Sequence, residues 1–358
     1  MDLEFKPDFE RARARWDKYW RGESFDRPVI RIVLPKPGAP QAKKPGNYAV
    51  AWAEDLGPII EQNLAWAAGL DWLGDAIPGV QITFAPDHFA LLLGADMTPS
   101  STREDGSVET VWVEPFLTDY DQEIRFRPEC KWWQRTVESI RAFRQRCDGR
   151  MLVFWTQLQG GLDALSAIRG PERLLMDLVL CPDDVKEALR QLDQALAGAT
   201  RALAAELDTA RFGSMTRHGM YSTGLLDVPQ CDFSAMISPE MFREFGLPSL
   251  QRQCGLLDAA EYHLDGPDAI KHLPALAEIK KIKTIQWQPG AGNAAAQDWS
   301  ALYKQIDELG LGQMRTGSPR QMADLWRGLR ARQYLYIAGL TEVATRAQAE
   351  AILERWPG

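Results

Sequence analysis

Short apolar segments alternate with helical segments along most of the chain, and this alternation limits the fold more than any other feature. Two examples are MLVFWT at residues 151–156 and YLYIAGL at residues 334–340, each with helical spacing of apolar residues on either side. Strands joined through helices pair in parallel, because a parallel pair needs a long crossover. Roughly seven or eight such units in about 300 residues predict an α/β fold, the TIM (β/α)8 barrel.

An amphipathic segment precedes the first expected strand. Apolar side chains recur at helical spacing from Phe9 to Trp20, and a strand is expected at residues 27–35. The barrel should therefore carry an N-terminal helical extension, and residues 1–358 are expected to form a single domain. No GxGxxG sequence follows the first strand and no GxxxxGK[ST] sequence occurs, which argues against a dinucleotide-binding or P-loop fold.

The charge and the cysteine content argue against several classes of protein. The chain has 41 Lys and Arg against 49 Asp and Glu, a net charge of −8, which disfavours binding to a nucleic acid. No apolar stretch of about 18 residues is present, so no membrane span is expected. No secretory leader is recognised either, and a cytoplasmic protein is expected. Five cysteines without CxxC spacing indicate free thiols rather than disulfides or a zinc finger.

The strongest candidate chemistry lies in the segment EYHLDG, residues 261–266. Active sites of barrels lie at the carboxyl ends of the strands, and residues two apart in a strand point to the same side. His263 and Asp265 should therefore face the barrel opening together. An imidazole and a carboxylate so placed can hold a divalent metal or share a proton. In the alternative interpretation, His263 is a core histidine and Asp265 caps the helix that follows Pro267.

Other polar residues near predicted strand ends are further candidates. His88 is a candidate metal ligand beside Asp87, which could instead serve only as a helix N-cap. Arg217 and His218 form a cationic pair that would accept an anionic substrate group, although a solvated loop would have the same sequence. Two more candidates for substrate binding are Asp232 and Gln288.

Two of the 13 tryptophans are also candidates, whereas most of the others are expected in the core. Trp155 and Trp287 are each expected at the end of a strand. An indole at that position could form the wall of a pocket for a flat or cationic ligand.

Several longer blocks resemble one family of proteins. The strings YSTGLLDVPQCDFSAMISPEMFREFGLPSL, EYHLDGPDAIKHL and IQWQPGAGN, with the opening ERARARWDKYWRGESFDRPVIRI, resemble the uroporphyrinogen decarboxylase-like superfamily. The branch that looks most similar is that of corrinoid-linked methyltransferases, the trimethylamine corrinoid protein 2-like group. The resemblance covers nearly the whole chain and implies a TIM barrel.

The resemblance also implies a metal centre, from which this chain departs in part. Coenzyme M methyltransferases of the superfamily hold zinc with a His-x-Cys pair and a later Cys. His263 matches that histidine, but Asp265 stands in place of the cysteine, and no cysteine follows Cys254. Oxygen in place of sulfur favours a metal-bound oxygen ligand over a thiol. The D-x-H-x-x-G sequence of a cobalamin-binding domain is absent, so a corrinoid would be carried by a partner protein.

The leading hypothesis is a metal-assisted methyltransferase that acts on a small methylated compound with a separate corrinoid protein. The expected catalytic residues are His263, Asp265 and His218. The expected ligands of a divalent metal, zinc by analogy with the family, are His263, Asp265 and His88. The expected substrate-binding residues are Trp155, Trp287, Arg217, Asp232 and Gln288. The alternatives are a metal-dependent decarboxylase, lyase or hydrolase of a small carboxylated or aromatic molecule, and a non-catalytic small-molecule binding protein. A homodimer is a common assembly for a barrel of this size.

Overall fold

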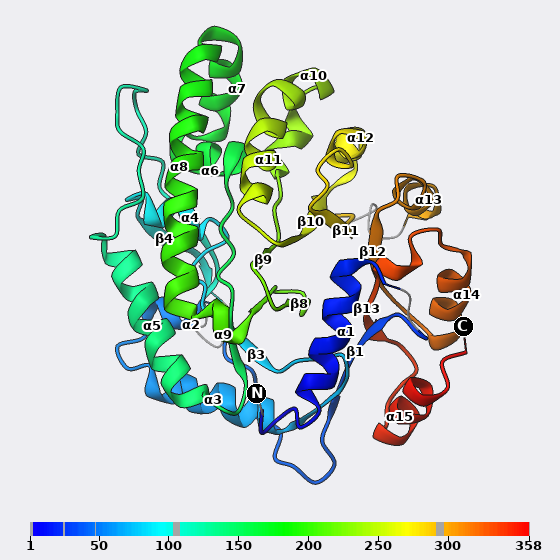
Figure 1. Ribbon diagram of the computed structural model, residues 1–358. Helices are drawn as coiled ribbons and strands as arrows, with labels where there is room; N and C mark the ends of the chain where they lie inside the picture. The colour runs from blue at the N-terminus through cyan, green and yellow to red at the C-terminus, as the bar shows by residue number, and fades with distance from the viewer. Residues whose placement is uncertain (1–2, 24–25, 47, 103–107, 291–296, 358) are drawn as a thin grey trace.

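A mainly parallel sheet lies at the centre of the molecule, and helices surround it (Figure 1). The computed structural model describes residues 3–23, 26–46, 48–102, 108–290 and 297–357. All neighbouring strands of this sheet pair in parallel except β2, which runs antiparallel to β1. The α/β class predicted from the sequence is therefore confirmed. In spatial order the seven strands are β2 (Leu70–Gly74), β1 (Val29–Pro35), β13 (Leu335–Leu340), β12 (Gly312–Gly317), β11 (Ile282–Gln288), β10 (Ala259–Asp265) and β9 (Leu226–Asp227).

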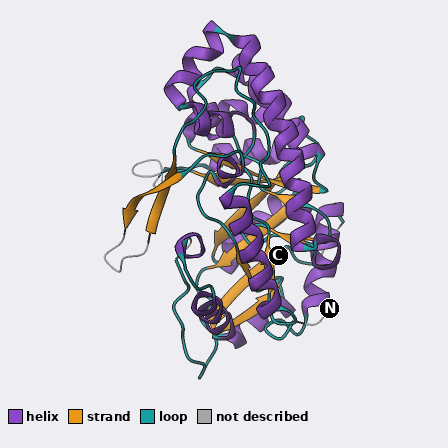
Figure 2. Ribbon diagram, turned by 90° about the vertical axis from the view of Figure 1, so that its left-hand side faces the viewer, coloured by secondary structure: helices purple, strands orange, loops and turns teal. Residues whose placement is uncertain are grey.

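The remaining strands form three pairs. β3 (Gly79–Gln81) runs parallel to β6 (Leu152–Phe154), and β7 (Ser214–Met215) runs antiparallel to β8 (Tyr221–Ser222). β4 (Met97–Thr102) and β5 (Val108–Val113) form the expected hairpin, which stands out from the body in Figure 2. Within the described residues, β3 and β6 form a pair that is not hydrogen-bonded to the seven-stranded sheet. These strand pairings therefore do not establish a closed barrel of eight strands.

The helices enclose the strands and vary widely in length. Two helices carry a capping box, in which Ser318 and Thr345 each accept a backbone hydrogen bond at the N-terminus. The α-helices are α1 (Phe9–Arg21), α2 (Ala49–Trp52), α3 (Gly57–Ala68), α4 (His88–Leu92), α5 (Lys131–Cys147), α6 (Gly161–Arg169), α7 (Pro171–Leu180), α8 (Pro182–Leu207), α9 (Thr209–Phe212), α10 (Pro239–Met241), α11 (Leu247–Gly255), α12 (Leu273–Leu276), α13 (Ser300–Glu308), α14 (Pro319–Gly328) and α15 (Arg346–Glu354). Short 3-10 helices include η1 (Asp232–Met236) and η3 (Pro267–His272), and η2 (Phe242–Gly246) is a π-helical segment.

Two elements are shorter than the sequence pattern predicts, and proline accounts for both. The spacing of apolar residues over about residues 50–69 predicts a single helix, but α2 and α3 divide this segment. Pro58 stands in the first turn of α3, and a residue that precedes proline is disfavoured in a helix. The strand expected at residues 75–84 is reduced to β3, because Pro78 has no N–H to donate to a neighbouring strand.

The N-terminal helix α1 agrees with the sequence pattern and packs on one end of the sheet. Trp16 and Tyr19 are fully buried. The Trp16 indole donates a hydrogen bond to the backbone oxygen of Asp75 (3.0 Å), and the Tyr19 hydroxyl donates one to that of Tyr334 (2.8 Å). Because Tyr334 directly precedes β13, α1 covers the amino-terminal end of that strand and leaves the carboxyl ends for the site.

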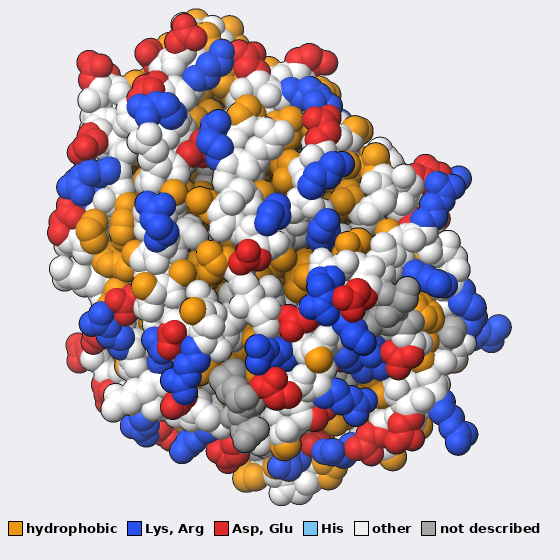
Figure 3. All heavy atoms as spheres, in the orientation of Figure 1, with side chains coloured by type: hydrophobic (Ala, Val, Ile, Leu, Met, Phe, Trp, Pro, Cys, Tyr) orange, Lys and Arg blue, Asp and Glu red, His pale blue; other side chains and the backbone are white. Residues whose placement is uncertain are grey.

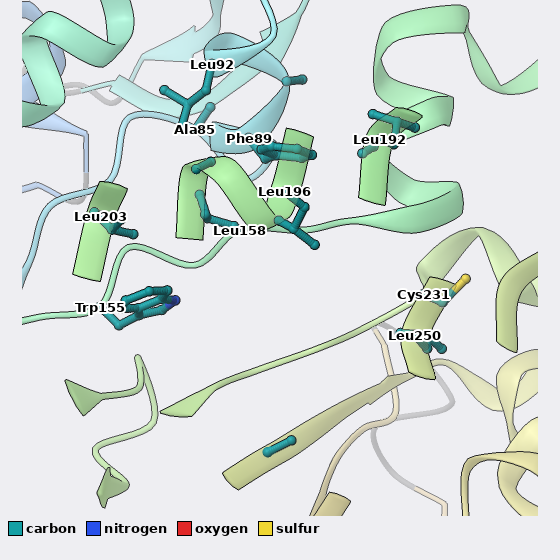
Figure 4. Packing of buried hydrophobic residues seen from close by; sticks show 14 of the residues in the cluster. Ala85, Phe89, Leu92, Trp155, Leu158, Leu192, Leu196, Leu203, Cys231 and Leu250 are labelled. Atoms are coloured by element: carbon teal, nitrogen blue, oxygen red, sulfur yellow. The ribbon is translucent and has the colours of Figure 1, made fainter. Parts of the chain in front are cut away.

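Apolar side chains fill the space between the strands and the outer helices (Figure 4). Phe89 of α4, Leu196 of α8 and Leu250 of α11 are each buried there, although they lie far apart in the sequence. This packing holds the helices in place around the sheet, including those near the carboxyl ends of its strands. No described helix combines the length and the apolar character needed to cross a membrane.

Candidate metal centre and its two cavities

Two cavities, each of about 500 Å³, open at the carboxyl ends of the strands. Gln159 lines both of them, so the two spaces adjoin. The first, named here the cationic cavity, is lined by residues that include Lys44, Gln157, Arg217, His218, Gln230 and His263. The second, named the acidic cavity, is lined by residues that include Asp87, Trp112, Asp163, Asp232, Phe233 and Met236.

Three side chains at the junction of the cavities lie close enough together to bind one ion. One ligand atom each of Asp232, His263 and Asp265 lies within 4.8 Å of the others. His263 and Asp265 are two residues apart on β10, and Asp232 begins η1, just after the neighbouring strand β9. His263 lines the cationic cavity and Asp232 lines the acidic one. An ion held by this cluster would therefore be reached from both sides.

The neighbouring strand β11 orients the ring of His263. His263 lies opposite Gln286 in the register of β10 and β11. The Gln286 amide nitrogen donates to the backbone oxygen of Trp287 (3.2 Å), so its oxygen accepts a hydrogen bond from Nδ1 of His263. This assigns the proton to Nδ1 and leaves the Nε2 lone pair for a metal ion. Burial, together with the charge of Arg217, lowers the pKa of His263 to about 4, so the ring is neutral at pH 7.

Negative charge gathers around Asp232. The buried carboxylate of Asp163 on α6 accepts hydrogen bonds from the backbone N–H groups of Asp232 (3.0 Å) and Phe233 (2.9 Å), which fixes the start of η1. The Asp232 side chain is exposed and lines the acidic cavity. Loss of hydration to the surrounding protein, together with the charges of Asp163 and Asp265, raises the pKa of Asp232 to about 8. A bound cation would relieve the repulsion among these carboxylates.

A chain of hydrogen bonds links β10 to the cationic cavity. The fully buried Glu261 accepts from Nδ1 of His218 (2.9 Å), and Nε2 of the same ring accepts from Nε of Arg217 (3.2 Å). Because Nε2 acts as an acceptor, these partners assign the neutral form to His218. Arg217 also donates to the amide oxygen of Gln230 (3.2 Å), whose nitrogen donates to Asp232 (2.7 Å). One network therefore joins Arg217 to the candidate metal cluster.

The structure places His88 away from this cluster, which corrects the expected third metal ligand. The ring is fully buried, and its Nδ1 accepts from the backbone N–H of Phe84 (3.2 Å). Its Nε2 donates to the hydroxyl of Thr136 (3.0 Å), because that hydroxyl donates to the backbone oxygen of Trp132 (2.7 Å). Burial lowers the pKa of His88 to about 3. Both ring nitrogens are used within the core, and Asp232 joins the cluster in place of His88.

The two candidate tryptophans are buried in the core, and neither lines the two cavities, which corrects their expected place. Trp155 is 1% exposed (Figure 4). Trp287 lies opposite Leu264 in the register of β10 and β11, one residue out of phase with His263, so its ring points to the other face of the sheet. There it packs edge-on against Trp299, with ring centroids 5.0 Å apart. Gln288 is exposed opposite Asp265.

Gln157, Lys44 and Asp163 are among the cavity residues that sequence reasoning missed. Gln157 lines the cationic cavity three residues after β6, where the rule of polar residues beyond strand ends would have found it. Lys44 belongs to a Pro- and Gly-rich loop and Asp163 to the first turn of α6. Neither of these two positions follows a predicted strand, so no local signal distinguishes them.

A solved structure has the same overall fold. A methyltransferase from Methanosarcina mazei superposes with a TM-score of 0.57, over 96% of this chain and 97% of that chain, at 13% sequence identity. At this identity the likeness shows a shared fold alone. No protein-family model matches the chain, and no curated protein does.

Proposed function

We propose that this chain is a metal-assisted methyltransferase of the (β/α)8 type that acts on a small methylated compound together with a separate corrinoid protein. The observation that carries the proposal is the position of the three-donor cluster at the junction of two cavities. Group transfer between two molecules requires both reactants beside one centre, and cavities on either side of Asp232 and His263 suit that need. The overall likeness to a methyltransferase supports the same reaction class.

The donor set fits a divalent ion such as zinc. One imidazole nitrogen and two carboxylate oxygens are common ligands of such ions. Nε2 of His263 is free, and within the described residues no hydrogen bond engages the carboxylate of Asp265. When bound, the ion supplies Lewis acidity at a substrate atom. Asp232, His263 and Asp265 would hold it, and Gln286 would keep the ring of His263 in the ligating orientation.

Residues of the chain also prepare the site for substrate. Gln230 holds the Asp232 carboxylate and the Arg217 guanidinium at the same time. The expected catalytic residue His218 lines the cationic cavity, but both of its ring nitrogens are engaged, so it acts by orienting Arg217. The apolar part of the cavity wall, which includes Val50 and Phe154, limits the access of water.

A metal-dependent decarboxylase, lyase or hydrolase is the second candidate, and one observation favours it. The cluster contains no thiolate, although Cys231 lies directly beside Asp232 in the sequence. Cys231 is 4% exposed, and burial raises the pKa of its thiol well above the usual value, so the sulfur stays protonated. Oxygen-rich sites suit oxygen ligands better than thiols.

The test combines metal analysis with an anaerobic methyl-transfer assay. We expect about one divalent ion per chain. We also expect methyl transfer from a methoxy or methylamine compound to a reduced corrinoid protein, or from a methylated corrinoid protein to a thiol, which a chelator abolishes. Asp265→Asn should abolish the transfer, whereas Asp324→Asn, an exposed change on α14, should not. Absence of transfer with any of these compounds would contradict the proposal. Release of CO2 or a hydrolysis product would select the second candidate.

A further inference from the structure

We infer that the cationic cavity binds a carboxylate group of the substrate, with Arg217 and Lys44 as its partners. This inference rests on the proposed function, because it names the substrate class of the same site. The inference depends on the two positively charged side chains that line the cavity and on the protein groups that each of them already contacts.

Arg217 brings a guanidinium to the cavity with neutral partners only. Two of its five N–H groups are used, one by Nε2 of His218 and one by the amide oxygen of Gln230. Among the described residues, no carboxylate forms an ion pair with it. The charges of Glu261, Asp227 and Asp232 act on Arg217 through space. The hydrogen bonds that link Glu261 and Asp232 to it run through His218 and Gln230. The remaining donors form a planar fork that matches a carboxylate.

Lys44 adds a second positive charge to the same cavity. Its ammonium group lies 4.9 Å from the centre of the Trp66 ring. Within the part of the chain that the structure describes, Lys44 has no carboxylate partner. Lys44 is exposed where it lines the cavity, and a positive charge on a cavity wall attracts an anionic ligand.

The rest of the wall indicates the shape of the ligand. Val50, Ile59, Val80 and Phe154 line the cavity together with the phenol ring of Tyr48. A volume of about 500 Å³ with an apolar wall and a few polar groups is typical of a site for a small molecule. The carboxylates of the acidic cavity would repel a second anion. A carboxylate would therefore bind at Arg217 and Lys44, with the apolar body directed toward His263.

Glu261 and His218 are positioning residues for this subsite. Glu261 fixes the tautomer of His218, and the imidazole in turn fixes Nε of Arg217. The guanidinium is thus held in place before any ligand arrives. Less conformational entropy is then lost on binding.

The experiment is calorimetric titration of the chelator-treated full-length protein without a corrinoid partner. The probes are 4-methoxybenzoate and its neutral analogue 4-methoxybenzamide. We expect the acid to bind at least about 10-fold more tightly than the amide, as a charge-assisted pair would provide. Arg217→Gln should remove this preference, and Lys44→Met should reduce it about threefold. Arg201→Gln, an exposed change on α8, should leave it unchanged.

Thermal unfolding of each variant checks that it folds. If Arg217→Gln does not fold, Lys44→Met and the ligand pair on the unaltered protein still decide the result. Equal affinity for acid and amide would overturn the inference, as would an unchanged preference in folded Arg217→Gln. Displacement of the acid by equimolar inorganic phosphate would overturn the carboxylate assignment. A preference for the acid without any methyl transfer contradicts only the proposed function, whereas transfer without that preference contradicts only this inference.

Discussion

Two histidines that the sequence pattern treats alike have opposite surroundings in the folded protein. His263 lies on β10, which pairs with β11 over most of its length, and it lines the cationic cavity. Its Nδ1 bonds to Gln286, and no hydrogen bond to Nε2 is found among the described residues. His88 follows β3, a strand of three residues, and both of its ring nitrogens are bonded within the core. Alternation of side chains holds to the end of a long paired strand. The short strand β3 ends at Gln81, so the chain has left the strand well before it reaches His88 at the start of α4.

The overall charge pattern of the surface does not explain the difference between the two histidines. Figure 3 shows charged side chains of both signs interspersed over one face of the molecule, with no field of a single sign. The difference is local, and it depends on which hydrogen-bond partners each ring meets. Substitutions at the two positions should therefore separate metal binding from fold stability.

The largest expected effect is the loss of metal on removal of His263. His263→Asn should weaken binding of zinc more than about 100-fold, because loss of a ligand exceeds the 10–100-fold cost of losing a ligand's own partner. The matched change His88→Asn keeps an acceptor for the N–H of Phe84 and should leave metal content unchanged. Elemental analysis and competition with a chromogenic chelator measure both. Equal loss of metal in the two variants would contradict the assignment of His263 to the metal site and of His88 to the core.

The partner of each ring provides the next contrast. Gln286→Met removes the acceptor for Nδ1 of His263 and should lower zinc affinity about 10–100-fold. Thr136→Val removes the partner of His88 and should leave zinc affinity unaltered. The same chelator competition applies. An unchanged affinity in Gln286→Met would mean that the bond between Gln286 and His263 does not orient the ligand.

The part of the site on β10 could be predicted because strand geometry alone determines it. His263 and Asp265 share a side through the two-residue repeat of any strand, whatever the rest of the chain does. The third donor, Asp232, could not be assigned in this way. Its position depends on the parallel pairing of β9 with β10 and on Asp163, which is 69 residues earlier and binds its backbone N–H.

The α/β fold class could be predicted from the sequence. The bounds of single elements could not, because of proline residues, and the orientation of some side chains depended on strand register. Alternating strands and helices predicted a mainly parallel sheet, and Phe9–Trp20 predicted α1 closely. The outward turn of Trp287 follows from the register, because it stands between Gln286, which lies opposite His263, and Gln288, which lies opposite Asp265. The burial of Trp155 does not follow in this way, since it depends on helices from distant parts of the chain (Figure 4).

Stability should depend on His88 rather than on His263. His88→Leu leaves the N–H of Phe84 without its acceptor in the core, which should lower the free energy of unfolding by about 1–3 kcal/mol. The hydroxyl of Thr136 loses the donor His88 but keeps its bond to the backbone oxygen of Trp132. His263→Leu, at the edge of a cavity, should lower it by less. Urea denaturation of the metal-free proteins measures both changes. A larger loss in His263→Leu would reverse the assignment of the two roles.

The pH dependence of stability tests the buried state of His88 separately. Burial lowers the pKa of His88 from its ordinary 6.5 to about 3, so the folded protein keeps the ring neutral where the unfolded chain takes up a proton. The free energy of unfolding should therefore fall as the pH drops from 6.5 toward 3, by at most about 1.4 kcal/mol per pH unit from this group. The stability gap between the unaltered protein and His88→Leu should shrink between pH 7 and pH 5, and a constant gap would contradict the buried neutral ring.

His218 combines features of the other two histidines and provides the finest test. Both of its nitrogens are bonded, as in His88, yet it lines a cavity, as His263 does. His218→Leu removes the acceptor for Nε of Arg217 and should reduce the preference for 4-methoxybenzoate over 4-methoxybenzamide about threefold to tenfold. His218→Gln retains an oxygen that can accept this bond, so it should restore most of the preference while amide affinity stays constant in both variants. Since a purely structural role would lower the affinity for acid and amide together, a parallel fall in the two would assign His218 to the fold, with His88.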